Sequence, residues 1–223
     1  MSISFISGDT AAADTITLPS LTVGDLIIGI GQDTSASAVT ITVPAGWWQH
    51  NVQATSVGRS RAYGVKTYDG SAFSFGSWTN ADKVSYLIFR SDIGLVYPMN
   101  VGTGSAVGTG ASLSHPTINS AVFSANLNNV RVLLVASSSV NGVGEENAIS
   151  GFTQIHRSTL ASNDLVCDLS NSTLGSFSSI SRALSVSSNT FGSSIALSEL
   201  PFIIPSGAGA SRRAHPFFSQ VIG

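Results

Sequence analysis

The chain has 223 residues, a formal net charge of −2 and only 10% charged residues, whereas hydrophobic residues make up 43%. This length suits one large β domain or two small ones with a substantial core. The slight acidic balance excludes a general nucleic-acid-binding protein, which needs a basic face, and the single cysteine, Cys167, excludes an internal disulfide framework. Because long charged side chains are depleted at interface cores, the composition favours a subunit of an assembly, although it also suits a plain β-rich extracellular protein.

In the first half of the chain, short apolar or alternating segments follow one another between turn residues, which predicts an all-β protein. The predicted strands there are Ser2–Ile6, Asp14–Leu18, Asp25–Gly31, Val39–Val43, Trp48–Ser56, Arg59–Tyr68, Phe73–Trp78 and Val84–Arg90. The continuous apolar run in Asp25–Gly31 is typical of a central strand. The alternation in Arg59–Tyr68 is typical of an edge or half-exposed strand.

The second half begins after a Gly-rich segment, Val101–Ala111, which we expect to be a flexible connection. The strands predicted beyond it are Leu113–Ile118, Val130–Ser138, Phe152–Arg157, Asp164–Asp168, Ser179–Val186 and Ser194–Leu200. The run in Val130–Ser138 again indicates a central strand. The predicted domain therefore spans residues 1–204, and residues 205–223 form an extended C-terminal arm.

Four segments of the first half have weak counterparts in the second half, which indicates an internal repeat with halves at about 1–100 and 112–204. The pairs are VGDLIIGIG with NVRVLLVASS, PAGWWQH with ISGFTQIH, SRAYGVKTY with NDLVCDLSN, and KVSYLIFRSD with SSIALSELP. Strands with one apolar face must pack against another layer. We therefore predict an antiparallel β-sandwich of jelly-roll type, possibly built from two related halves.

The order of these motifs resembles a bacteriophage virion structural family, in which GDLxx, PxGW and GFT motifs follow one another. Here the corresponding residues are Gly24–Ile28, Pro44–Trp47 and Gly151–Thr153, within a match that covers roughly residues 14–200. The resemblance implies a β-sandwich found among tail, baseplate or head-decoration proteins. The doubled tryptophan at Trp48 and the C-terminal arm depart from the family pattern and leave the point of attachment open.

The adjacent tryptophans of PAGWWQH are predicted to have different roles, because neighbouring side chains of a strand point to opposite faces. Trp47 corresponds to Phe152 in the repeat and is predicted to be a core anchor. Trp48 corresponds to Thr153 and is predicted to face outward, where it contacts another subunit, is covered by a loop of the same chain, or stacks on a glycan.

The C-terminal arm is the other predicted contact region. Its apolar side chains follow two arginines and a proline and cannot be buried within the arm itself, so it can add to a sheet edge or fill a groove of a neighbour. A disordered tail is the alternative. The predicted interface residues are Trp48, Arg212, Arg213, Phe217, Phe218, Val221 and Ile222.

Residues with catalytic or metal-binding chemistry show no pattern typical of a site. The four histidines lack the spacing of metal ligands, no G-x-S-x-G elbow is present, and Cys167 lies in an apolar–polar run typical of a small buried residue. The Gly-rich segment lacks the lysine of a phosphate-binding loop. We expect no enzyme activity, no cofactor and no metal.

The sequence as a whole predicts a non-enzymatic virion protein that forms a homo-oligomer, for which a trimer is one option. A tail, baseplate or fibre component is the first choice. The alternatives are a capsid decoration protein on the head surface and a glycan-binding adhesin module that recognises a host surface glycan. With no signal-peptide pattern and no long apolar run, we expect synthesis in the bacterial cytoplasm, other virion proteins as partners, no membrane insertion and no nucleic acid.

Overall fold

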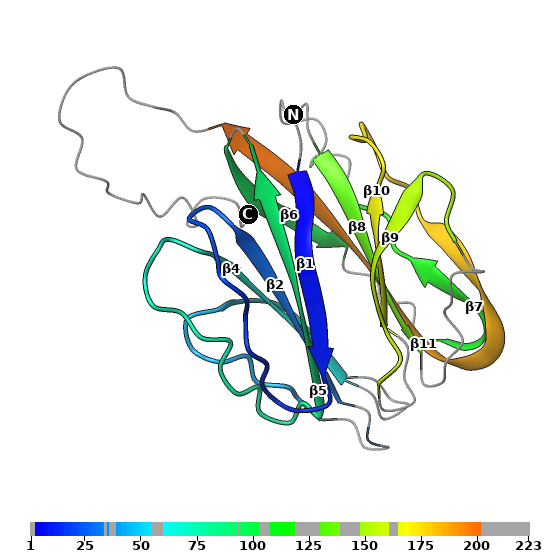
Figure 1. The fold of residues 1–223 in the computed structure, drawn as a ribbon. Coiled ribbons are helices and arrows are strands. Elements are labelled where there is room, and N and C mark those ends of the chain that lie inside the picture. Colours follow the sequence, from blue (N-terminus) through cyan, green and yellow to red (C-terminus); the bar gives the residue numbers. More distant parts are fainter. Residues whose placement is uncertain are drawn as a thin grey trace, which may run out of the picture.

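The computed structural model describes residues 3–33, 35, 39–54, 60–92, 94–102, 108–118, 130–138, 148–160 and 165–201. These residues form antiparallel β-sheets, and no α-helix occurs among them. Hence none of them belongs to a helix that is long and apolar enough to span a membrane. The predicted all-β class with a β-sandwich is confirmed (Figure 1).

The first sheet contains five strands from the first half of the chain, in the order β1-β5-β2-β4-β3. Their bounds are β1 Ile3–Ala11, β2 Leu26–Asp33, β3 Trp48–Ala54, β4 Ser60–Thr67 and β5 Lys83–Ser91. All eight residues of β2 are buried, as expected for its apolar run at the centre of the sheet. The prediction that Arg59–Tyr68 forms an edge or half-exposed strand is wrong, because β4 lies between β2 and β3 and its first six residues are buried.

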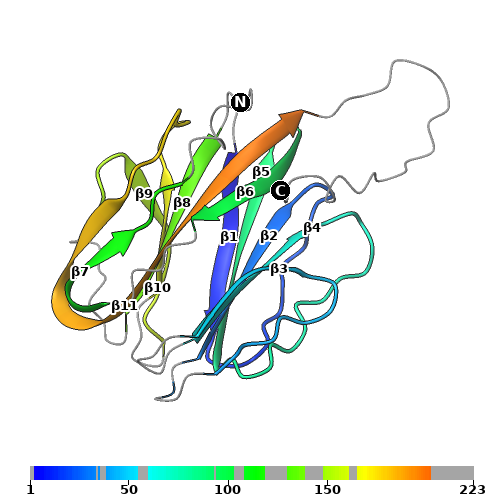
Figure 2. The same ribbon diagram turned by 180° about the vertical axis from the view of Figure 1, so that it is seen from behind.

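The second sheet is built from residues 94–201, in the order β6-β11-β8-β10-β9, with β7 paired to β11 off this path. Strand β6 therefore belongs to the second sheet, although its residues fall in the predicted first half. The bounds are β6 Gly94–Gly102, β7 Gly108–His115, β8 Val130–Ser138, β9 Phe152–Ser158, β10 Leu165–Ser170 and β11 Ile180–Pro201. Strand β11 bends sharply, so that its first part pairs with β7 and its last part with β6 and β8 (Figure 2).

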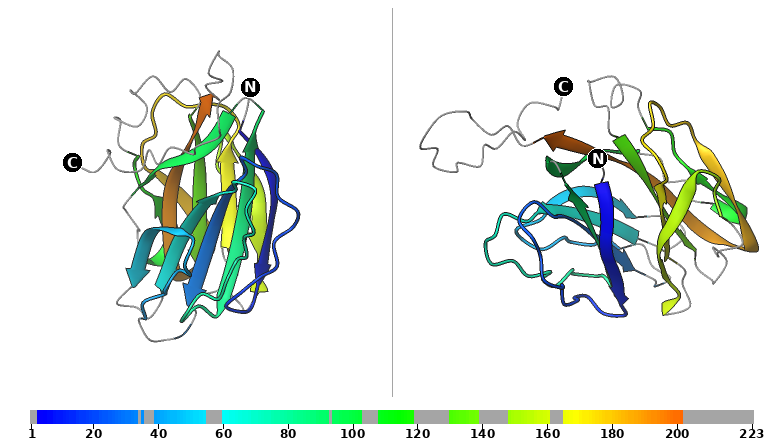
Figure 3. Two further views of the ribbon diagram at one scale, coloured as in Figure 1. Left: turned by 90° about the vertical axis from the view of Figure 1, so that its left-hand side faces the viewer. Right: turned by 45° about the horizontal axis from the view of Figure 1, so that its top comes forward.

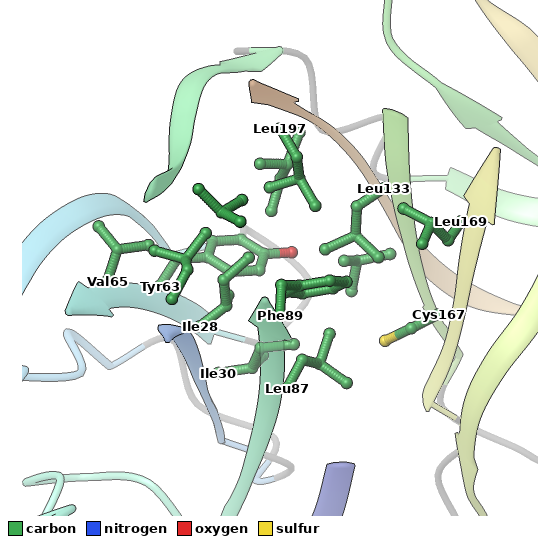
Figure 4. Close-up of a cluster of buried hydrophobic side chains, with 14 of the residues drawn as sticks. Ile28, Ile30, Tyr63, Val65, Leu87, Phe89, Leu133, Cys167, Leu169 and Leu197 are labelled. Carbon is green, nitrogen blue, oxygen red and sulfur yellow. The ribbon is translucent and has the colours of Figure 1, made fainter. Parts of the chain in front are cut away.

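The largest hydrophobic cluster lies between the two sheets (Figure 4). Ile28, Leu87 and Phe89 contribute from the first sheet, and Leu133 and Leu169 contribute from the second. Smaller clusters cover the outer face of each sheet. Both faces of each sheet are therefore covered, which explains the continuous apolar runs of the central strands, residues 26–31 of β2 and 132–136 of β8.

The two sheets share more than their strand order. Ile28 of β2 lies opposite Leu87 and Val65, and Leu133 of β8 lies opposite Ile195 and Leu169, in the same relative positions. The segments paired in the sequence repeat therefore fall on equivalent strands, β2 with β8, β3 with β9, β4 with β10 and β5 with β11.

Irregularities of the ladders also coincide. The ladder between β3 and β4 shifts at His50, and the ladder between β9 and β10 shifts at Ile155. The ladders of β1 with β5 and of β6 with β11 shift at Ile6 and Met99. Because β-bulges are features of a particular backbone path, their shared positions show that the two halves follow the same path. In the right-hand view of Figure 3, the blue and cyan strands of the first half lie to one side of the yellow and orange strands of the second.

The structure corrects several boundaries. The jelly-roll arrangement is not confirmed, because strands of a jelly roll cross repeatedly between the sheets, whereas here each sheet uses consecutive segments. The expected connection Val101–Ala111 is partly strand, since β6 extends to Gly102 and β7 begins at Gly108. Strand β6 was not predicted, and the two last predicted strands are one strand, β11.

Three predicted strands of the first half are not strands. Asp14–Leu18, Val39–Val43 and Phe73–Trp78 form no ladder among the described residues, apart from one isolated bridge between Thr42 and Thr79. Their apolar side chains cover the outer face of the first sheet, which explains their strand-like alternation.

Candidate interaction surface

Trp47 packs on the outer face of the first sheet. Its Nε1 donates a hydrogen bond to the carbonyl oxygen of Phe75 at 2.9 Å. Its ring is 5.1 Å from that of Phe73, 5.2 Å from that of Phe75 and 5.6 Å from that of Trp78, all in edge-on geometry. Trp47 is half-buried, so it anchors the outer cover and not the cluster between the sheets.

Trp48 is exposed to 45% of its surface at the start of β3, the edge strand of the first sheet. Its Cα pairs with that of Val65, which belongs to the cluster between the sheets. Residues directly opposite in a ladder share a face, so the indole lies at the open edge of this cluster. Trp48 is exposed as predicted; its contact with a partner stays a prediction.

An apolar groove runs along the outer face of the first sheet between two segments that lie outside the ladders, residues 15–21 and 72–77. It has a volume of about 570 Å³. Its floor consists of half-buried or buried apolar side chains that also belong to the outer cluster: Ile16, Leu18, Leu21, Tyr68, Phe73 and Phe75. Hydroxyl side chains, such as those of Thr17 and Ser74, line its lips and are exposed.

The two ends of the groove are held by backbone hydrogen bonds. At one end, Trp78 N donates to Asp14 O at 2.8 Å. At the other end, Gly24 N donates to Tyr68 O and Tyr68 N donates to Asp25 O, both at 2.8 Å. Asp25 in turn accepts two hydrogen bonds from the guanidinium of Arg90, at 2.6 and 2.9 Å, which raises the pKa of Arg90. The groove therefore has a fixed frame.

Exposed carboxylates stand at both ends of the groove. Asp14 accepts a hydrogen bond from the Ser77 hydroxyl. Asp69 accepts hydrogen bonds from the side chain and backbone of Ser71, and these lower its pKa. The ammonium of Lys66 lies 5.5 Å from the ring centroid of Phe73 and is the nearby positive charge. The groove is thus apolar inside and weakly acidic at its ends.

A buried polar network crosses the molecule at the other end of the sheets. Arg61 is 2% exposed, donates to Tyr63 Oη at 2.8 Å and to Ser137 Oγ, and lies 4.5 Å from the ring centroid of Phe191. Tyr63 donates to Ser193 Oγ at 2.9 Å, so the network joins β4 of the first sheet to β8 and β11 of the second. This connects the sheets through polar contacts beside the apolar core.

The network continues into the layer outside the second sheet. His115 of β7 is fully buried and donates from Nδ1 to the carbonyl oxygen of Ser193 at 3.1 Å. Burial lowers the pKa of His115 to about 3, and the nearby charges of Arg182 and Arg61 act in the same direction. Arg182 of β11 forms a buried ion pair with Asp168 of β10; burial nevertheless raises the pKa of that carboxyl. These contacts fasten β7 and the first part of β11 to the sheet.

A second cluster of hydroxyl and histidine groups lies where β1 faces β9. Thr10 Oγ1 is 2.8 Å from Ser85 Oγ and 2.9 Å from His156 Nε2. Burial lowers the pKa of His156, and Lys83, fully buried, donates to the carbonyl of Leu160 at 3.1 Å. Because Ser85 is also fully buried, a substrate cannot reach this hydroxyl without a rearrangement, and the contacts instead join the two sheets.

The part of the chain that the structure describes contains neither a metal-binding site nor an accessible thiol. No group of three His, Cys, Asp or Glu side chains is arranged to hold a metal there. Cys167 is fully buried in the cluster between the sheets, and this burial raises the pKa of its thiol. The prediction that Cys167 is a small buried residue is confirmed.

Of the predicted interface residues, the structure places only Trp48. Arg212, Arg213, Phe217, Phe218, Val221 and Ile222 lie outside the described residues, as does the whole C-terminal arm. The groove was not predicted, although the apolar alternation of residues 15–18 and 73–78 was noted as a strand signal. Buried Arg61, Lys83 and Arg182 were not predicted either, because a sequence pattern does not show which charged residues are covered by another layer.

Comparison with known protein families, characterised proteins and solved structures finds no match for this chain. The fold and the surfaces above are therefore the basis for a functional proposal, together with the family resemblance of the motifs.

Proposed function

We propose that this chain is a non-enzymatic structural protein of a bacteriophage virion, a component of the tail, baseplate or fibre that assembles through its β-sandwich and C-terminal arm. The observation that carries the proposal is Trp48, 45% exposed at an open sheet edge in a chain with only 10% charged residues. Exposed aromatic side chains beside an apolar core are enriched at protein interfaces. The motif resemblance to virion proteins points to the same class.

Other features support a scaffold role over a catalytic one. Buried Arg61 and Tyr63 join the first sheet to the second, and buried His115 and Arg182 fasten β7 and the first part of β11 to the second sheet. A homo-oligomer, with a trimer as one option, would cover Trp48 and the apolar end of the arm. Such a contact fits a protein whose surface relies on Ser, Thr and Asn for solubility.

Truncation tests the role of the arm. Deletion of Pro205–Gly223 is expected to leave a folded β-sandwich, with a β-sheet circular dichroism spectrum and a cooperative unfolding transition, while the protein no longer joins phage particles. Trp48→Ala is expected to weaken self-association with a stability change below about 1 kcal/mol. Normal incorporation of both variants into particles would contradict the proposal.

A capsid decoration protein on the head surface is the alternative position. Copy number separates the two, since decoration proteins occur in hundreds of copies per particle and tail components in far fewer. Quantitative mass spectrometry of purified virions measures this number directly.

A glycan-binding adhesin is the second alternative, because an exposed indole can stack on a sugar ring. A glycan array probed with the full chain and with Trp48→Ala tests it. Binding by the full chain that Trp48→Ala abolishes would favour the adhesin, and absence of binding by either form would remove it.

A further inference from the structure

We propose that the C-terminal segment Pro216–Gly223 docks as an extended strand in the groove between residues 15–21 and 72–77 of its own chain. This inference goes beyond the virion assignment, because it concerns the isolated chain. Its arguments are the unpaired backbone of the groove walls, the length and chemistry of the segment, and the place where the arm begins.

The groove walls offer backbone groups without partners. Within the described residues, no backbone N–H of residues 15–18, 20–21 or 72–77 donates a hydrogen bond. Both segments are nevertheless held at their two ends by the bonds of Trp78 with Asp14 and of Tyr68 with Asp25. An extended peptide placed between them would find hydrogen-bonding partners on both sides, as in strand addition to a sheet edge.

The C-terminal segment has the chemistry that this groove would bind. The residues of Phe217–Ile222, FFSQVI, carry no charge and are mostly aromatic or β-branched, which favours an extended strand. Six residues span about 20 Å as a strand, and each wall of the groove is a segment with a similar number of residues. Alternate side chains, such as Phe218 and Ile222, would then contact the floor around Tyr68 and Phe73.

The arm begins at a suitable place. Strand β11 ends at Pro201, opposite Gly94, directly after the end of β5 at Ser91. At this end of the first sheet β2 also begins, and the groove closes there through Tyr68. Residues 202–215 can span up to about 50 Å, which is ample for a path to the groove.

Because the segment is covalently linked to the domain, the segment that docks is expected to come from the same chain. A short linker gives an attached segment an effective concentration in the millimolar range, so in dilute solution the chain's own segment outcompetes that of a second copy. At the high concentrations of an assembly, the same contact can be exchanged between copies as in domain swapping.

The charges at the ends of the groove indicate in which direction the segment runs. Asp69 stands at the end of the groove nearest to Pro201, and Asp14 stands at the far end. Arg212 and Arg213 precede the apolar residues of the segment, so a chain that enters from the Pro201 end brings them to Asp69. Lys66 over Phe73 reduces this attraction only in part, because the other positive charge near the groove, Arg90, is paired with Asp25.

Hydrogen exchange of the full chain tests the contact. The backbone amides of residues 15–18 and 72–77 are expected to exchange at least about tenfold faster in the variant Phe218→Asp/Ile222→Asp than in the unaltered chain. In the variant the segment no longer docks, so it no longer protects these amides from solvent. The matched control Ser219→Asp/Gln220→Asp adds the same charge but keeps the apolar side chains, and should alter exchange far less. Equal exchange in all three proteins would overturn the proposal.

Disulfide trapping in the full chain identifies the source. Ser74→Cys on the exposed lip with Ser219→Cys in the arm should form an intramolecular disulfide under mild oxidation, since the native Cys167 is buried. The control pair Ser176→Cys with Ser219→Cys places the first thiol on the outside of the second sheet and should give little product. A predominantly dimeric product at micromolar concentration would overturn the assignment to the chain's own segment.

The outcomes separate this inference from the virion proposal. A chain that is found in phage particles but shows neither protection nor trapping disproves the docking alone. A chain that shows both and is absent from particles disproves the virion role alone. Protection of the groove by added host oligosaccharide, with no effect of the arm variant, would assign the groove to a glycan and overturn the docking.

Discussion

The outer faces of the two sheets differ although their inner faces are built alike. Ile28 and Leu133 occupy equivalent positions between the sheets, and the third residue after each is Gly31 in β2 and Ala136 in β8. Above Gly31 lies the fully buried ring of Trp78, so close that a Cβ there would be 2.5 Å from its Cε3. The first sheet is thus covered by aromatic rings.

On the second sheet a strand takes the place of the rings. Gly192 of β11 lets the backbone of β7 approach so closely that a Cβ at this position would overlap the carbonyl oxygen of Ser114. The cover is then fastened by the ion pair of Arg182 with Asp168 and by buried His115. The same arrangement of strands is therefore covered by aromatic rings on the first sheet and by a β-strand on the second. The positions of the small residues decide which of the two packs on the outer face.

The largest expected effect is the loss of the aromatic cover. Trp78→Ala should lower the free energy of unfolding by about 4–5 kcal/mol, because it removes a fully buried ring and leaves a cavity over β2. Urea denaturation measures the loss. A loss as small as that of Trp48→Ala, whose side chain is 45% exposed, would show that the outer cover contributes little to stability.

Breaking the ion pair tests the other cover. Asp168→Asn should cost about 3–4 kcal/mol, because Arg182 loses its carboxylate while it stays buried. The double variant Asp168→Leu/Arg182→Met removes both charges at similar volume and should be clearly more stable than the single variant. If the double variant is as unstable as the sum of its parts, the charges themselves are required.

Lowering the pH should reduce the free energy of unfolding mainly through His115 in the second sheet. The pKa of His115 is about 3 in the folded chain and near 6.5 when unfolded, so the unfolded state binds the proton first. Stability is complete above pH 6.5 and decreases as the pH falls toward 3, by on the order of 2 kcal/mol between pH 6.5 and 4.5. His156 contributes in the same direction. Urea midpoints across this range, compared with His115→Gln, measure the effect; an equal slope in both proteins would contradict it.

The smallest expected effect on stability tests why a glycine is needed at position 31. Gly31→Ala should cost about 1–2 kcal/mol by overpacking against Trp78. In a Trp78→Leu background the same substitution should cost less than about 0.5 kcal/mol, since the ring is gone. Equal costs in both backgrounds would show that the alanine strains the strand itself.

The sequence predicted the sandwich and its central strands because β2 and β8 each contain a continuous apolar run, which needs two covered faces. The ladder register places Trp48 opposite Val65 and Thr153 opposite Leu169, two pairs that the sequence alignment of the segments also matches. The sequence could not predict which of the segments with alternating apolar residues form a ladder with another strand. Phe73–Trp78 alternates like a strand because it packs on a sheet, without a ladder of its own.

The candidate surface was predicted only at Trp48. The groove depends on two segments that are distant in sequence, residues 15–21 and 72–77, and no local pattern brings them together. Strand β6 was missed because Pro98 and Asn100 interrupt its pattern, whereas at a sheet edge such residues are tolerated.

Each ladder among the described residues pairs strands within residues 3–91 or strands within residues 94–201. During synthesis, the first sheet can therefore complete its backbone pairing as soon as Ser91 has left the ribosome. Its inner face, with Ile28, Leu87 and Phe89, has no partner until the second half follows, which takes about 5–20 s at ordinary elongation rates. For that interval the nascent chain presents an apolar sheet that a second nascent copy of the same sheet would fit.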